Sequence, residues 1–346
     1  MPPKAQKGVP NGADEFSLTK ENYEKELQEL AAKAREQTTF RSVMTNVAVL
    51  MQAVQILACA GVYSNLSQFT LSPVYGSIPA SIWHISLVST AACIGWAASS
   101  WLRGNLSRKP VLFLAPIALS IPTVQHFLFQ LSYYLGPIYG PPLTELLTLM
   151  PLLIFSASAV DQLLEELDLS ALPKSVAEAA PGLGSFLFFQ VVERLSKSVI
   201  LNNIGANFLQ SRVGLQLVVG GLYAKIGPST LLMYALPALF HTAFLNPHIQ
   251  APWATFDLNM KMDRSVGFKV LARQDSITGY LSVLENTREN YRVLRCDHSL
   301  LGGNWLPHDQ VRVNEPIYGV FAMLEAVRLI QVDHSVGPRA ENALVM

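Results

Sequence analysis

The sequence has 346 residues, of which 50% are hydrophobic and 14% are charged, against about 25% charged residues in ordinary soluble domains. The formal net charge is zero, which argues against nucleic acid as a partner because nucleic-acid-binding proteins carry a basic excess. The three cysteines, Cys59, Cys93 and Cys296, fit neither metal-ligand spacing nor an even-numbered disulfide framework, so no metal site is predicted.

Residues 1–41 are predicted to form a polar N-terminal arm. No apolar segment of the kind found in a cleavable signal peptide follows the start of the chain. Ser17 or Thr19 can cap a helix. Charged residues then recur at four-residue spacing along one helical face: Glu21, Lys25, Glu29 and Lys33. We therefore expect a solvated helix that leads into the apolar region.

Residues 42–248 contain apolar runs long enough to cross a bilayer, which takes about 20 residues of helix. The clearest runs are Val43–Ser64, Ala80–Trp101, Val111–Leu135 and Leu143–Val160. A later apolar piece, 213–246, is interrupted at Gly227-Pro228, which predicts two further spans joined by a tight turn. The expected fold class is mainly α: a transmembrane bundle of six helices followed by a small α+β segment.

The stretch Gly182–Ile200 has two interpretations. Its apolar first half favours a seventh span, whereas Glu193, Arg194 and Lys197 favour a helix at the membrane interface, which is the preferred interpretation. Lys and Arg precede the first run and follow the second, while residues 65–79, the expected loop between these two runs, carry no charge. The positive-inside rule then predicts a multi-pass membrane protein in a lipid bilayer, with its N-terminus and its C-terminal segment in the cytoplasm.

Several polar residues lie in or at the ends of these runs: His84, Gln125, His126, Glu145, Asp161 and His241. One interpretation is a path for protons or a substrate. The other is helix ends and hydrogen bonds between helices, worth about 1 kcal/mol each. Only Gln125 and His126 are central in their run, which favours the second interpretation.

Residues 249–346 have the pattern of a small sheet with a helix. Lys269–Gln274, Tyr280–Leu284 and Tyr291–Cys296 alternate apolar and polar residues as half-buried antiparallel strands do. Residues 286–290 supply a turn between the last two strands. Pro316 fits the first position of a helix that is expected to run to Ile330 and to cover one face of the sheet.

Three short sequence motifs in this segment resemble, in composition and order, the N-terminal segment of spermidine and spermine synthases: Gln274–Tyr280, Arg292–Gly303 and Glu315–Glu325. With the apolar region in front, the chain more closely resembles the fungal, membrane-anchored branch of that family. The resemblance implies that Gln274 contacts decarboxylated S-adenosylmethionine, and that Tyr318 is a second substrate-binding residue. It implies no cofactor and no catalytic residue in this chain, because the Gly-rich turn and the acidic base of the family would follow Met346.

Two functions are weighed on this basis. The first is a membrane protein of polyamine metabolism in the synthase family, a transferase family, shortened before its Rossmann domain and catalytically incomplete. The second is a membrane carrier or scaffold without aminopropyl transfer. A polyamine would favour an acidic pocket, but an ordinary solvated acidic loop is the preferred interpretation of these residues: Glu145, Asp161, Glu165, Glu166 and Asp168. A second copy of the chain is a candidate partner for the small sheet, which needs packing support.

Overall fold

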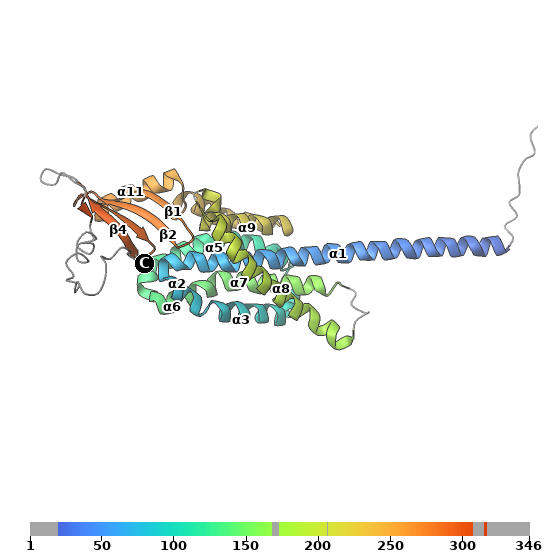
Figure 1. The fold of residues 1–346 in the computed structure, drawn as a ribbon. Coiled ribbons are helices and arrows are strands. Elements are labelled where there is room, and N and C mark those ends of the chain that lie inside the picture. Colours follow the sequence, from blue (N-terminus) through green and yellow to red (C-terminus); the bar gives the residue numbers. More distant parts are fainter. Residues whose placement is uncertain (1–19, 168–172, 206, 307–314, 317–346) are drawn as a thin grey trace, which may run out of the picture.

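The protein is mostly helical and carries one small antiparallel sheet. The computed structural model describes residues 20–167, 173–205, 207–306 and 315–316. Figure 1 shows the sheet at one end of a helical body, with the N-terminal half of the first helix projecting from the opposite end.

The first helix, α1 (Lys20–Tyr75), is 56 residues long and joins the predicted arm helix and the first apolar run without a break. No glycine or proline interrupts residues 20–60, so nothing in that stretch opposes a continuous helix. The prediction of a loop over residues 65–79 is wrong, because α1 continues to Tyr75. The chain turns at Gly76, whose φ of 94° is a conformation that glycine adopts without strain.

The remaining helices of the body are mostly short. Their bounds are α2 (Ser77–Ile82), α3 (His84–Ala97), α4 (Ser99–Asn105), α5 (Val111–Gln130), α6 (Ser132–Leu147), α7 (Leu149–Leu164), α8 (Lys174–Asn203), η1 (Phe208–Gln210), α9 (Arg212–Ile226), η2 (Thr230–Ala235), α10 (Leu236–Phe240) and η3 (His241–Leu245). The predicted turn at Gly227-Pro228 is confirmed, since α9 ends at Ile226 and η2 begins at Thr230.

The expected six-span bundle is not supported as a fold class. Four helical stretches of the described chain are long and apolar enough to cross a membrane, judged by length and composition alone: Val43–Tyr75, Ser77–Ala97, Val111–Gln130 and Ser132–Leu164. The predicted pair of spans over 213–246 is replaced by α9, which has 15 residues, and by a shorter apolar helical stretch, Thr230–Leu245. The α8 helix has 30 residues but does not meet the same criteria.

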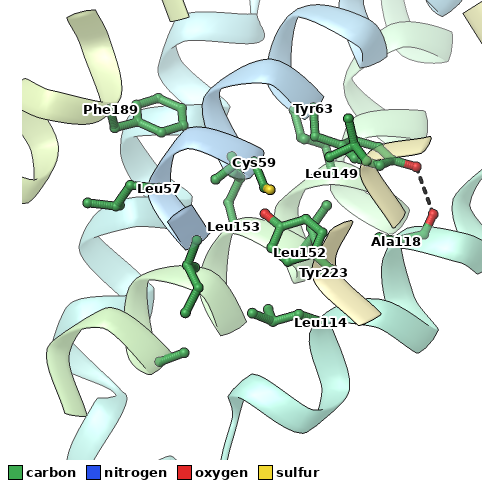
Figure 2. Close-up of a cluster of buried hydrophobic side chains, with 14 of the residues drawn as sticks. Leu57, Cys59, Tyr63, Leu114, Ala118, Leu149, Leu152, Leu153, Phe189 and Tyr223 are labelled. Atoms are coloured by element: carbon green, nitrogen blue, oxygen red, sulfur yellow. Dashed lines mark hydrogen bonds between the residues drawn. The ribbon is translucent and has the colours of Figure 1, made fainter. Parts of the chain in front are cut away.

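A buried cluster of apolar side chains holds α1, α5, α7 and α9 together (Figure 2). Tyr63 of α1 and Tyr223 of α9 are fully buried within it. The Tyr63 hydroxyl donates a hydrogen bond of 2.7 Å to the carbonyl oxygen of Ala118, while the Tyr223 hydroxyl lies 3.3 Å from the Ser156 hydroxyl. These bonds satisfy the polar ends of two large rings, so the cluster buries them at little cost.

The sheet is an antiparallel meander in which each strand pairs with the next in sequence. Its strands are β1 (Phe268–Asp275), β2 (Tyr280–Asn286), β3 (Tyr291–Cys296), β4 (Ser299–Trp305) and β5 (Glu315–Pro316). The three predicted strands are confirmed. Two further strands, β4 and β5, were not predicted. β4 follows β3 through a tight hairpin in which Asp297 takes a φ of 49°.

The helix that covers the sheet is α11 (Pro252–Val266), which precedes the strands in sequence. Leu258 and Met262 of α11 pack against Val270, Leu284 and Val293, which are the buried residues of the sheet. The prediction that a helix beginning at Pro316 fills this role is wrong at its start, because Pro316 lies in β5 and pairs with Asn304. The rest of that predicted helix lies outside the described residues.

Candidate functional site

A polar cavity of about 160 Å³ lies where the helical body meets the sheet. Its walls come from α1, α5 and α9, from the segment that follows η3, and from β1 and β2. It therefore collects side chains from parts of the chain that are far apart in sequence. A small ligand in this cavity could contact several polar side chains at once.

One wall of the cavity is an ion pair between Arg212, the first residue of α9, and Asp275, the last residue of β1. Arg212 Nη1 lies 3.2 Å from Asp275 Oδ1, and the two side chains are only 8% and 6% exposed. The backbone N–H of Arg212 also donates to Asp275 Oδ2 at 2.9 Å. The carboxylate thus sits at the N-terminus of α9, where the helix dipole and free N–H groups stabilise negative charge.

The start of α9 is fixed by its own sequence. Ser211 precedes the helix, and its hydroxyl accepts a hydrogen bond of 3.1 Å from the N–H of Gly214. Serine is a favoured residue at this capping position because it satisfies an N–H that has no partner within the helix. The cap therefore sets the position of Arg212 at the end of the sheet.

The floor of the cavity is a pair of amides from facing helices. Gln216 Nε2 of α9 donates to Gln125 Oε1 of α5 at 3.0 Å, and the two residues are 0% and 1% exposed. This bond leaves Gln125 Nε2 and Gln216 Oε1 without a hydrogen-bond partner. Arg212 Nε and His126 Nδ1 are likewise buried and unpaired. A buried polar atom without a partner costs about 1–3 kcal/mol, so four of them around one cavity need an explanation.

The rings of His126 and His248 line part of the cavity, and their centroids lie 6.0 Å apart. The His241 ring, which does not line the cavity, has its centroid 5.0 Å from that of His126. Among the described residues no group of three or more His, Cys, Asp or Glu side chains is arranged to hold a metal ion. On β2, burial raises the pKa of the Tyr280 hydroxyl, against an opposing effect of Arg273, so the hydroxyl stays protonated and able to donate.

The sheet is attached beside the cavity by Arg273. Its guanidinium donates to the carbonyl oxygens of Pro247 and Ile249, and its Nε donates to Thr255 Oγ1 at 3.0 Å. On the other side His298 Nε2 lies 3.0 Å from the carbonyl oxygen of Val74. These contacts fix the sheet to the helical body, so both walls of the cavity are held in place.

A second polar cluster is buried between α1, α3, α6 and α8. His84 Nδ1 lies 2.6 Å from Glu145 Oε1, and His84 Nε2 lies 3.0 Å from the Ser64 hydroxyl. Ser64 donates to Glu193 Oε1 at 2.6 Å. Each of these side chains has a partner inside the cluster. The interpretation of His84 and Glu145 as groups that bond between helices is therefore favoured over an open path.

The substrate-binding residues predicted from sequence do not meet in the cavity. Gln274 is exposed, and it precedes Asp275 on β1, so its side chain points to the opposite face of the strand. Tyr318 lies outside the described residues. Both roles stay predictions.

The acidic residues considered for a polyamine do not form one pocket. Glu145 pairs with His84, and Glu165 pairs with Arg103 on the surface. Asp161 is half-buried and Glu166 is exposed, while Asp168 lies outside the described residues.

Sequence reasoning identified part of the cavity. Gln125 and His126 were selected because polar residues are costly inside an apolar run, and His241, selected for the same reason, contacts His126 but does not line the cavity. Arg212, Gln216 and Asp275 were missed. The signal for Arg212 was a serine cap followed by a charged residue at the start of an apolar helix, but nothing local in the sequence pairs it with Asp275, 63 positions away.

The chain is similar to a curated protein, the N-terminal histidine N-methyltransferase of Emericella nidulans. The two are 39% identical over 317 residues, which cover 89% of this chain and 56% of the relative. The chain thus spans little more than half the length of the relative that it matches. No family model matches the chain, and no solved structure matches it.

This similarity overturns the family suggested by short phrases in the sequence. The relative is named as a methyltransferase. Its 39% identity over most of the chain is stronger evidence than three short motifs that resemble spermidine and spermine synthases. The predictions of polyamine metabolism and of a carrier or scaffold are therefore wrong, and the predicted fold class of a multi-span transmembrane bundle is not supported beyond a mostly helical protein with a small antiparallel sheet.

Proposed function

We propose that this chain forms part of an N-terminal histidine N-methyltransferase. The observation that carries the proposal is its 39% identity to a protein of that name over 317 residues, which cover 89% of this chain. The cavity between these two parts agrees with the proposal, because it gathers buried polar groups that have no partner of their own.

In such a reaction a bond forms between a nitrogen of the substrate and a methyl carbon, while the bond from that carbon to its donor breaks and a proton leaves the nitrogen. The residues of this chain would hold the substrate in position, since orientation alone supplies a large part of the rate in group transfer. Among the described residues, Gly302 and Gly303 lie inside β4 and do not open a helix, so they form no nucleoside-binding turn. We therefore assign no donor site to the described part of the chain.

The test is methyl transfer by the full natural protein. The protein is incubated with S-adenosylmethionine that carries a labelled methyl group and with three peptides of one sequence: one that begins with histidine, its N-acetylated form, and one that begins with alanine. Label is expected only in the first peptide, on its first residue. Equal labelling of all three peptides, or no label in the first, would overturn the proposal.

We also propose that the helical body contacts a lipid bilayer. Large apolar side chains on its outer surface are exposed, such as Ile78 at 73% and Ile85 at 70%. An exposed apolar surface of this extent marks a contact with a membrane or a partner. The protein is expected to stay with the membrane pellet after an alkaline carbonate wash and to be released by detergent. Its release by carbonate alone would contradict the proposal.

The division of the chain at about residues 41 and 248, the cytoplasmic orientation and self-association stay predictions. Reporter fusions at the two ends of the chain test the orientation.

A further inference from the structure

We propose that the cavity between the helical body and the sheet binds the imidazole ring of the substrate's first residue. This inference rests on the proposed function, which supplies the histidine. It adds a site and a mode of recognition, because the name of the relative assigns no residue in this chain.

The first argument is size. The cavity measures about 160 Å³. A protein cavity of roughly 150 Å³ is large enough to bind benzene, so a five-membered imidazole ring fits in this one. A second cavity, of about 480 Å³, lies between α1, α3, α7 and α8, but its lining is mostly apolar and contains no charged or amide side chain.

The second argument is hydrogen-bonding capacity. A neutral imidazole carries one N–H donor and one nitrogen acceptor. The bond between Gln125 and Gln216 uses one donor and one acceptor and leaves one of each free. Exchanging oxygen and nitrogen in both amides leaves the same inventory, so the argument does not depend on how the amides are oriented.

These groups give a specific arrangement for the bound residue. The free amide oxygen, Gln216 Oε1, accepts from the ring N–H and thereby fixes the tautomer of the imidazole. The buried donors Gln125 Nε2 and Arg212 Nε fit the carbonyl oxygen of the same residue. The second ring nitrogen then keeps its lone pair, which is the state that a nitrogen needs in order to accept a methyl group.

The third argument is access. His248 lines the cavity and is itself exposed, so the cavity reaches the surface at that residue. The ion pair of Arg212 and Asp275 closes another side, next to the end of β1. The side chain of a peptide's first residue can enter such a cavity. An internal histidine is followed and preceded by peptide backbone, which does not fit in the same space.

The test measures binding separately from catalysis. Histidyl-glycinamide and alanyl-glycinamide are titrated into the full natural protein by calorimetry. Gln216→Leu, which removes the acceptor, is expected to weaken binding of histidyl-glycinamide about tenfold, which is what loss of one buried hydrogen bond costs. The matched control is Gln162→Leu in α7, a half-buried glutamine away from the cavity that bonds to the carbonyl of Ser99. It is expected to bind like the parent.

A second variant covers the case in which Gln216→Leu does not fold. Thr70→Met extends into the cavity from α1 and leaves both glutamines in place, so it is expected to weaken binding of histidyl-glycinamide through loss of space. Unchanged binding in either folded variant would overturn the inference. Methyl transfer with an unchanged KM in Gln216→Leu would overturn it too and leave the proposed function standing. Selective binding without any methyl transfer would support the site and refute the function.

Discussion

Arg212→Leu is expected to lower the free energy of unfolding by about 3–5 kcal/mol, which is the usual cost of removing one partner of a buried ion pair. Asp275 would keep the backbone N–H of residue 212 as a donor but would lose the guanidinium that neutralises it. Denaturant unfolding followed by tryptophan fluorescence measures the change. Lys261→Leu is the matched control, since it breaks the exposed pair with Asp257 and should cost under about 1 kcal/mol.

The double variant Arg212→Leu/Asp275→Leu distinguishes the cost of leaving the Asp275 carboxylate unpaired from the cost of losing the contact between the two side chains. If the unpaired carboxylate causes most of the loss, the double variant should be more stable than Arg212→Leu alone. Equal stability of Arg212→Leu and Lys261→Leu would show that the pair does not hold the sheet against α9.

The sheet could be predicted from the sequence because the pattern that indicates each strand lies within a few consecutive residues. Strands β1, β2 and β3 show the alternation of a surface with one buried face, and each supplies one buried apolar residue, Val270, Leu284 and Val293. In β2 the alternation favoured the wrong face, because the apolar residues Leu281 and Val283 are only half-buried while Leu284 is buried. The covering helix was missed because apolar residues alternate with polar ones from Phe256 to Lys261 of α11, a pattern that is typical of a strand and not of an amphipathic helix. Only its packing against the sheet reveals which of them matter, namely Leu258 and Met262.

For the helical body, the sequence predicts where helices form but not how they are arranged. Long apolar runs predict helices, and α5 lies within the run Val111–Leu135. The run Leu143–Val160 is instead divided between the end of α6 and most of α7. The same runs do not fix the number of elements that cross a membrane, because length and hydropathy say nothing about which face packs inside the protein. In α5, for example, polar Gln125 and His126 are buried, while the neighbouring Phe127 is 52% exposed.

The cavity depends on tertiary contacts that no local pattern contains. The sequence drew attention to Gln125 and His126 because burying a polar residue in an apolar run costs free energy. It did not show which residues contact them in the folded protein. Gln216 lies 91 positions from Gln125. The family resemblance failed for a related reason: short phrases in the sheet segment resemble one family, while identity over 317 residues relates the chain to a protein with another name.

His84→Leu is expected to destabilise the protein by about 3–5 kcal/mol, because it leaves the buried carboxylate of Glu145 without its partner. Glu145 is 1% exposed, so water cannot replace the imidazole. Glu193 keeps the Ser64 hydroxyl as a donor, which limits the loss on that side. The measurement is thermal unfolding in detergent, with the loss of helical circular dichroism as the signal.

The neighbouring Trp83 gives the control. It is largely exposed, so Trp83→Leu should change stability by no more than about 0.5 kcal/mol. The further variant His84→Leu/Glu145→Leu removes both members of the pair. It should recover part of the stability that His84→Leu loses, since an apolar pair of similar volume can replace a buried ion pair. If His84→Leu unfolds at the same temperature as Trp83→Leu, the cluster does not stabilise the packing of α3 against α6. The buried ionisable side chains of the cluster would then need a role in binding or proton transfer instead.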